Sequence, residues 1–226
     1  MPNEAIRVTV DTVVLAVQQE ALEVLLVKRK YEPFKNCWAL PGGFLVDETD
    51  ETIEIAAERE LLEETNVGNI YLEQLYTFGD RGRDPRGRIV TVAYLALVRQ
   101  EGLELRASSD ASGVAWWPVL DLPDVAFDHK RIVEYAHQRL RYKIEYSPAA
   151  FMLLPEKFRL RDLQSVYEAV LGRSVDNRNF RKKFLNTGVL QELNETSQEG
   201  SYRPARLYSF SEEEFDKLPD RPVFAF

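Results

Sequence analysis

Three glutamates near the middle of the chain fall on one face of a predicted helix. Glu60, Glu63 and Glu64 stand at positions i, i+3 and i+4, so their side chains project from the same side of an α-helix. Carboxylate oxygens are the ligands that Mg²⁺ and Mn²⁺ prefer, and Mg²⁺ usually keeps water and substrate phosphates in its shell. The spacing therefore indicates a candidate divalent-cation site for phosphate chemistry. The alternative is a solvated acidic stripe that binds nothing.

The flanking sequence predicts how this helix is positioned. Residues 41–43, Pro-Gly-Gly, are a turn signal, and the acidic stretch 47–51 suits a helix N-terminus with Thr49 or Asp50 as the N-cap. Asn66 suits the left-handed conformation that ends many helices. The apolar stripe between these ends consists of Ile53, Ala56, Ala57, Leu61 and Leu62. We therefore expect an amphipathic helix that packs against a sheet and follows a glycine turn.

The sequence around the acidic helix is rich in strand patterns. Strands are expected at 6–17, 22–30, 71–78, 88–98 and 113–118, followed by a long helix at 128–145. The connection at residues 79–88 carries Arg81, Arg83, Arg86 and Arg88. Because arginine forks match phosphate oxygens, these side chains are candidate contacts to a phosphate or nucleotide effector. The alternative is a solvated hairpin connection.

This part of the chain resembles the Nudix hydrolase family. The family box reads Gly, five residues, Glu, seven residues, then Arg-Glu-apolar-X-Glu-Glu-X-Gly-apolar. Here Glu51 is followed by seven residues and the stretch 59–67, with two extra residues after Gly43 and Asn66 in place of the last glycine. The resemblance implies an α+β fold, an α/β/α sandwich with a mixed sheet, and metal-assisted attack of water on a pyrophosphate. It also implies Mg²⁺ or Mn²⁺ bound by Glu60, Glu63, Glu64 and the Gly43 backbone, Arg59 orienting the carboxylates, and Glu51 completing the cradle.

Composition restricts the classes of protein. The net charge is −8, with one cysteine, Cys37, and two histidines, His129 and His137. A histidine-built zinc site and an internal disulfide are therefore not expected. The sequence shows no long uncharged apolar run and no signal-peptide pattern, so we expect a cytoplasmic protein without a membrane partner.

The C-terminal part differs in charge and pattern. Residues 155–206 carry 10 basic and 7 acidic side chains, and Ser147-Pro148 suggests a boundary between domains at 1–147 and 148–226. Helices are expected at 160–171 and 176–186, and short strands at 190–193 and 206–210, an order that suggests a winged helix. The candidate DNA contacts are Asn177, Arg178, Asn179, Arg181, Lys182 and Lys183 on the second helix, with Arg203 and Arg206 on or beside the wing. The alternative is an accessory or dimerisation domain with a basic solvent face.

Nearly the whole chain is similar to the Nudix-related transcriptional regulators. The similarity extends to residues 126–129, 179–183 and 203–208. It implies a homodimeric repressor that binds operator DNA and senses ADP-ribose, with genes of NAD metabolism as targets, although some relatives sense a sugar and control pentose use. A second hypothesis is a magnesium-dependent ADP-ribose pyrophosphatase that yields AMP and ribose 5-phosphate and has an accessory C-terminal domain. The sequence does not identify the operator, the effector or the general base.

Overall fold

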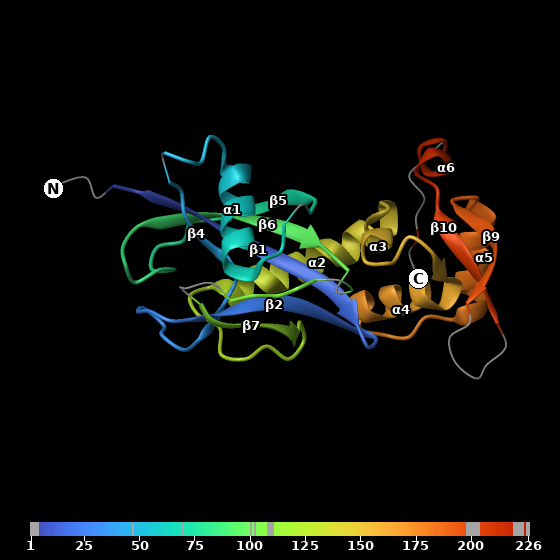
Figure 1. The fold of residues 1–226 in the computed structure, drawn as a ribbon, viewed down its shortest axis with the longest axis horizontal. Coiled ribbons are helices and arrows are strands. Elements are labelled where there is room, and N and C mark those ends of the chain that lie inside the picture. The colour runs from blue at the N-terminus through green and yellow to red at the C-terminus, as the bar shows by residue number, and fades with distance from the viewer. Residues whose placement is uncertain are drawn as a thin grey trace. The chain divides into compact units, whose positions relative to one another are not determined.

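The computed structural model describes residues 5–46, 48–68, 70–99, 101, 103–107, 111–197, 204–218 and 224 (Figure 1). The chain divides into two compact units. The first comprises Met1–Ala16 and Glu23–His137, and the second comprises Val17–Leu22 and Gln138–Phe226. No helix within the described ranges is both long enough and apolar enough to cross a membrane.

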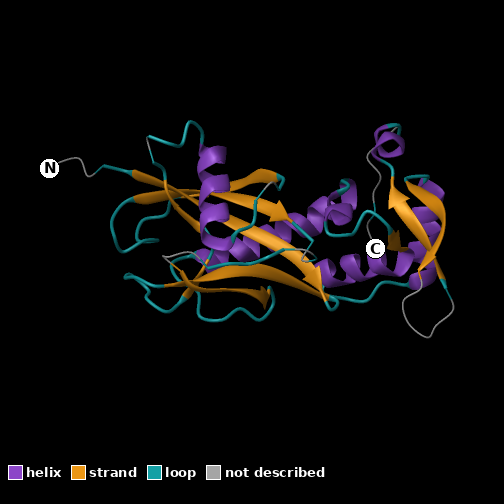
Figure 2. Cartoon of the chain, in the orientation of Figure 1, coloured by secondary structure: helices purple, strands orange, loops and turns teal. Residues whose placement is uncertain are grey.

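A seven-stranded mixed sheet forms the framework of the first unit (Figure 2). The strand order is β3-β2-β1-β6-β5, with β4 paired to β1 and β7 paired to β2. The strands are β1 (Arg7–Gln18), β2 (Ala21–Arg29), β3 (Trp38–Ala39), β4 (Gly42–Phe44), β5 (Leu72–Phe78), β6 (Ile89–Leu97) and β7 (Ala111–Pro118). β1 and β6 are parallel, whereas β4 is antiparallel to β1 and β5 is antiparallel to β6. The five strands predicted from alternation are confirmed, while β3 and β4 are too short to show a period.

The acidic helix α1 spans Ile53–Thr65. Thr52 is its N-cap, because the Thr52 Oγ1 accepts a hydrogen bond from the Ile55 N–H at 3.2 Å. The expectation that Thr49 or Asp50 caps this helix is therefore wrong; the Asp50 carboxylate is bound to Arg59 instead. Asn66 ends the helix at φ 63°, and its N–H donates to the Leu62 carbonyl, as predicted.

Two helices cover the sheet. Figure 1 shows α1 in front of the strands and the first turns of α2 (His129–Tyr146) behind them. On α1, Ala56 and Ala57 pack into a buried cluster with Val10 and Tyr94 of the sheet. On α2, Ile132, Val133 and Ala136 are fully buried. Helices on both faces of a mixed sheet match the α/β/α arrangement expected from the sequence.

The second unit is built around two consecutive helices followed by a β-hairpin, with shorter elements on either side. Its elements after α2 are α3 (Ala149–Met152), β8 (Phe158–Arg159), α4 (Leu160–Leu171), α5 (Asn177–Thr187), β9 (Leu190–Ser197), β10 (Ala205–Phe210) and α6 (Glu212–Asp216). The three strands form an antiparallel sheet in the order β8-β10-β9. Left-handed Gly172 and Gly188 end α4 and α5. This order of elements is the winged helix that the sequence predicted.

Aromatic side chains form the core of the second unit. Phe180 and Phe184 of α5 are fully buried, and each ring centroid lies 5.4 Å from that of Tyr167 on α4. The Tyr167 hydroxyl donates a hydrogen bond of 2.8 Å to the Ile144 carbonyl. Phe224 stacks on Phe184 at 4.7 Å. These contacts fix which face of α5 is buried and therefore which face meets solvent.

Candidate functional site

Arg59 is the centre of the charge network on α1. Its Nη1 donates to Glu60 Oε1 at 2.9 Å and to Glu63 Oε2 at 3.4 Å. Its Nε and Nη2 also form a two-point pair with Asp50, at 2.8 and 2.7 Å, and Asp50 is only 1% exposed. This pair holds the pKa of Asp50 well below its usual range. Arg59 thus contacts two of the predicted ligands, the carboxylates that the family resemblance expects it to orient.

From the loop before α1, the carboxylate that reaches Arg59 is that of Asp50, whereas the sequence assigned the neighbouring Glu51 to the cradle. Glu51 is exposed, in a bend just before α1. Sequence matching to the family box selected Glu51 by its spacing from Arg59. The two extra residues after Gly43 provide the signal that this loop takes a different path.

Glu60 and Glu64 lie against the glycine turn. The Gly42 N–H donates to Glu64 Oε2 at 2.9 Å. A Cβ added at Gly43 would come within 2.2 Å of Glu60 Oε1, so any other residue there would displace that carboxylate from its position. Burial raises the pKa of Glu60 and raises the pKa of Glu64 to about 7. Glu63, by contrast, is 59% exposed.

The oxygen donors on this face suit a hard cation, because carboxylates and carbonyls are the ligands that Mg²⁺ takes. Glu60 and Glu64 beside Gly43 supply them. Within the part of the chain that the structure describes, however, no three acidic or histidine side chains are gathered closely enough to hold a metal ion. Glu63 is mostly exposed, and its carboxylate accepts a hydrogen bond from Arg59.

The arginine-rich connection lies between β5 and β6. Arg83 is buried and forms a two-point pair with Asp128, at 3.0 and 2.7 Å, and also lies 3.5 Å from Asp11. Arg86 forms a similar pair with Asp84 at 3.0 and 2.7 Å. The predicted effector arginines therefore do not share one environment.

The other two predicted arginines differ again. Arg81 is exposed in a turn. Arg88 is half-buried, and its Nη1 is buried without a hydrogen-bond partner among the described residues. Among the four arginines, Arg88 therefore has a buried Nη1 without a hydrogen-bond partner among the described residues, and Arg81 is exposed to solvent.

Asp11 and His129 form a buried pair that sequence patterns do not reveal. His129 Nε2 lies 3.4 Å from Asp11 Oδ1, and His129 Nδ1 accepts a hydrogen bond from the Leu40 N–H at 2.9 Å. Because Nδ1 accepts, the proton of the neutral ring is on Nε2, facing Asp11. Burial raises the pKa of Asp11 to about 6 and lowers that of His129 to about 3.

The candidate DNA-binding helix α5 presents its polar residues to solvent. Its N-cap is Asp176, whose carboxylate accepts a hydrogen bond from the Asn179 N–H at 2.7 Å. Opposite the buried Phe180 and Phe184, five of the predicted contacts are exposed and Lys183 is half-buried. The exposed five are Asn177, Arg178, Asn179, Arg181 and Lys182. The helix therefore offers a basic face suited to a nucleic-acid groove.

The wing is formed by β9 and β10. Arg206 is exposed on β10 and pairs with Glu192 of β9 across the hairpin. Arg203, the other predicted wing residue, lies outside the described residues. The wing charge next to α5 is thus partly neutralised within the hairpin.

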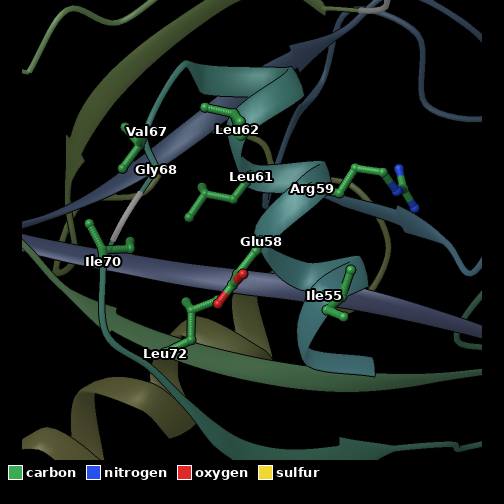
Figure 3. A pocket seen from close by; sticks show the side chains of 9 residues that line it. All are labelled: Ile55, Glu58, Arg59, Leu61, Leu62, Val67, Gly68, Ile70 and Leu72. Atoms are coloured by element: carbon green, nitrogen blue, oxygen red, sulfur yellow. The ribbon is translucent and has the colours of Figure 1, made fainter. Parts of the chain in front are cut away.

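A separate pocket of about 280 Å³ lies along α1 (Figure 3). Figure 3 shows Glu58 pointing toward Leu72 while Arg59 extends away from it. The remaining walls are Ile55, Leu61, Leu62, Val67, Gly68 and Ile70. With mostly apolar walls and only Arg59 from the predicted site, this pocket is not the place where the acidic face and the glycine turn meet.

Two family models match the chain. Residues 6–136 match the NUDIX domain, and residues 150–210 match the NrtR DNA-binding winged helix domain. The chain is 38% identical over 210 residues to the ADPR responsive transcriptional repressor NtrR of Acinetobacter baylyi, a match that covers 92% of this chain and 83% of that protein.

Two solved structures extend the similarity. The crystal structure of Shewanella oneidensis NrtR complexed with a 27mer DNA has a TM-score of 0.79 and 37% identity, covering 92% of this chain and 95% of that one. The NUDIX domain of the same protein complexed with ADP ribose has a TM-score of 0.57 and 42% identity, covering 61% of this chain and 90% of that one.

Proposed function

The chain belongs to the Nudix family and carries an NrtR DNA-binding winged helix domain, and from this premise we propose that it is an ADP-ribose responsive transcriptional repressor. The observation that carries the proposal is the match of both domains, in one chain, to a repressor over 92% of its length. Genes of NAD metabolism are the proposed targets, with pentose genes as the alternative, and the cytoplasm is the proposed location.

The winged helix is the proposed DNA reader. We place the domain boundary at residue 147, with the Nudix domain at 1–147 and the winged helix at 148–226. The basic face of α5, from Asn177 to Lys183, enters the major groove, where arginines contact phosphates or guanine edges and asparagines read adenine. Arg206 on the wing and Arg203, which lies outside the described residues, are the further proposed contacts to DNA. A homodimer would present two such helices to a two-fold symmetric operator.

The Nudix domain is the proposed receptor. Glu60, Glu63, Glu64 and the Gly43 backbone are the proposed ligands of Mg²⁺ or Mn²⁺, oriented by Arg59, and Glu51 is proposed to complete the cradle. A bound cation would neutralise the phosphate charge of an effector at this face. The proposed effector contacts are Arg81, Arg83, Arg86 and Arg88.

Switching requires that the effector bind one state of the protein more tightly than the other. An effector that favours the DNA-incompetent state lowers operator affinity by the ratio of its two binding constants, and operator DNA lowers effector affinity by the same factor. If ADP-ribose relieves repression, a single coupling free energy describes the effect. It can be measured as the change in DNA affinity caused by ADP-ribose or as the change in ADP-ribose affinity caused by DNA.

A second function, ADP-ribose hydrolysis, is favoured by the retained acidic residues. Arg59 bridges Glu60 and Glu63, and Glu60 and Glu64 lie against the Gly42-Gly43 turn. In this alternative a bound Mg²⁺ polarises the pyrophosphate, and the products are AMP and ribose 5-phosphate. Either Glu63→Gln or Glu64→Gln would abolish this turnover, and unchanged turnover in both variants would exclude these residues as ligands.

The test is a gel-shift titration with DNA from upstream of the protein's own and neighbouring genes. The titration is run at one moderate salt concentration, with and without ADP-ribose and Mg²⁺, because phosphate contacts make the affinity salt-dependent. The same mixtures are assayed for AMP. A specific shift that ADP-ribose weakens is the expected result.

The other outcomes separate the two functions. AMP release together with the shift would mean that the regulator also consumes its signal. Steady AMP production without a specific shift on any of these DNAs would make the protein an enzyme with an accessory domain. A specific shift that ADP-ribose leaves unchanged would support the role as a DNA-binding regulator and would exclude ADP-ribose as its effector.

A further inference from the structure

The turn between α4 and α5 is held by two side chains of α4. Glu168 Oε1 accepts a hydrogen bond from the Val175 N–H at 2.8 Å, and Gln164 Nε2 donates to the Val175 carbonyl at 3.1 Å. Gln164 Nε2 also donates to Glu168 Oε1 at 3.1 Å, so the two side chains, one helical turn apart, brace each other. Gln164 and Glu168 thus bind both backbone groups of Val175, and we call this arrangement the turn clasp.

Val175 stands immediately before the N-cap of α5. The carboxylate and the carbonyl of Asp176, the next residue, accept hydrogen bonds from the Asn179 and Phe180 N–H groups, at 2.7 and 2.9 Å. Residues 172–174 of the turn are exposed, whereas Val175 is buried. Because the N-cap follows Val175 directly, the clasp fixes the point at which α5 begins relative to α4.

The aromatic core fixes a later part of α5. Phe180 and Phe184 pack against the Tyr167 ring of α4, and the first of them lies one turn into the helix. Apolar burial is also non-directional, so it restrains the rotation and the height of a helix less sharply than hydrogen bonds do. The placement of the first turn of α5, residues 177–179, therefore depends on the clasp more than on the core.

The first turn of α5 carries side chains suited to reading base edges. Asn177, Arg178 and Asn179 are exposed there. In helix-turn-helix proteins the N-terminal residues of the second helix are the ones that contact base edges in the major groove. A shift of this turn relative to α4 would move these side chains away from the bases, whereas the attraction of basic side chains to phosphates tolerates such a shift.

We propose that Gln164 and Glu168 are positioning residues for DNA recognition, because the turn clasp sets the start of α5 at the height and rotation that sequence reading needs. Both residues act through the Val175 backbone and not by contact with DNA. The proposal rests on the proposed function for the identity of the nucleic acid. It deepens that function by separating the reading of sequence, which depends on the clasp, from the attraction to phosphates, which does not.

Variants of the full chain test the clasp. Glu168→Ala removes the acceptor of the Val175 N–H, and Gln164→Met removes the donor to the Val175 carbonyl while it keeps a side chain of similar length. Glu168→Gln is the conservative variant, because its amide oxygen can still accept both hydrogen bonds. Glu212→Ala is the matched control, since it removes an exposed glutamate from α6 of the same unit. Thermal unfolding of each variant reports whether it folds.

Fluorescence anisotropy compares two DNAs at one salt concentration. One is the upstream fragment that the natural chain shifts specifically, and the other is an unrelated fragment of the same length. Glu168→Ala and Gln164→Met should bind the specific fragment about 10-fold more weakly, a loss comparable to that of one base contact. Their affinity for the unrelated fragment should change by less than about two-fold, because phosphate attraction remains. Glu168→Gln and Glu212→Ala should keep the specificity ratio of the natural chain.

Hydrogen exchange of the Val175 amide is a second measurement that needs no DNA. Without its acceptor, this amide should exchange at least about 10-fold faster in Glu168→Ala, and the amides of the first turn of α5 should follow it. In Glu168→Gln the rate should stay close to that of the natural chain. If Glu168→Ala does not fold, the comparison of Gln164→Met with the natural chain on both DNAs decides.

The outcomes separate the clasp from the proposed function. An unchanged specificity ratio in Glu168→Ala and Gln164→Met would overturn the role of the clasp in reading DNA. Equal losses on both fragments would also overturn it, because the clasp would then only stabilise the fold. If the natural chain prefers none of the fragments, the DNA-reading function fails and takes this role with it. Faster exchange of the Val175 amide in Glu168→Ala would in that case still show that the clasp holds the turn.

Discussion

Asp50 and Arg59 are joined by two hydrogen bonds, of 2.8 and 2.7 Å. Asp50 lies in the loop before α1, and Arg59 lies within the helix. Arg59 is thereby fixed at one end while its Nη1 bonds Glu60 and Glu63 at the other. Asp50 also accepts a hydrogen bond from the Val46 N–H at 2.7 Å, so the loop before α1 is anchored to the same carboxylate. The orientation of the acidic face therefore depends on Asp50, which contacts Arg59 and none of the three glutamates.

The first prediction is that Asp50→Asn weakens binding of Mn²⁺. The amide keeps the size of the side chain but loses one acceptor and the charge, so Arg59 no longer holds Glu60 and Glu63 in place. A residue that orients a metal ligand typically contributes about 10- to 100-fold in metal affinity. Titration of Mn²⁺ followed by electron paramagnetic resonance measures the change. Glu48→Gln, at an exposed turn position in the same loop, is the control; equal losses in both variants would point to general loss of charge instead.

The second prediction concerns Glu64 and pH. Its pKa is about 7 in the folded chain against 4.5 as its ordinary value, so between these values the folded state keeps a proton that the unfolded state releases. The free energy of unfolding therefore falls as pH rises through this window, by on the order of 3 kcal/mol for this group. Asp11, with a pKa of about 6, acts in the same direction, and His129, with a pKa of about 3, in the opposite one.

Comparison with Glu64→Gln isolates the contribution of Glu64. Urea denaturation in the presence of a chelator, from about pH 4.5 to about pH 8, should show a decline for the natural chain that is smaller in the variant. Because a cation binds the ionised carboxylate, added Mg²⁺ should stabilise the natural chain above about pH 7 and much less at about pH 5. Identical pH profiles for the two proteins would mean that the Glu64 carboxyl is not protonated near neutral pH.

The third prediction is a gain in stability at the hairpin between β1 and β2. Its two loop residues, Gln19 and Glu20, have φ values of 47° and 67°, the paired left-handed conformation of a type I′ turn. Glycine adopts this conformation without the steric cost that glutamine pays. Gln19→Gly should therefore stabilise the chain by about 0.5–1 kcal/mol. Urea denaturation measures the change, and a loss of stability would mean that the entropy of the unfolded glycine outweighs the relieved strain.

Periodic patterns explain which parts of this protein are predictable from sequence. The acidic helix, the long strands and the helix at 160–171 have apolar periods long enough to identify, and the structure confirms them. The fold of both domains follows from these elements. The ends of α4 and α5 were also predictable, because Gly172 and Gly188 supply the left-handed caps.

The side-chain pairs were not predictable in the same way. Arg83 with Asp128, and Asp11 with His129, join residues that are far apart in sequence, and only the folded sheet brings them together. Counting residues from Arg59 selected Glu51 for the cradle, which stays a prediction, whereas the pair between Asp50 and Arg59 depends on the path of the loop.

The last prediction concerns the basic face of α5. Phe180 and Phe184 are fully buried, which directs Arg181 into solvent one residue after Phe180. If this face enters a DNA groove and Arg181 contacts a base, Arg181→Ala should weaken operator binding by about 1–3 kcal/mol. If Arg181 contacts a phosphate instead, the variant should bind all DNA sequences more weakly by a similar factor. The salt dependence separates these cases, since loss of one phosphate contact lowers the slope of log K against log salt by about 1.

A matched control makes this last experiment decisive. Arg139→Ala removes an exposed arginine from the part of α2 that belongs to the same unit. It changes the net charge by the same amount and leaves α5 unaltered. Gel shifts at several salt concentrations should show weaker binding for Arg181→Ala than for Arg139→Ala, while both variants keep the ADP-ribose affinity of the natural chain. Equal DNA affinities for the two variants would remove α5 from the groove and leave its basic face as a solvated surface, since the charge lost is the same and only the helix that carries it differs.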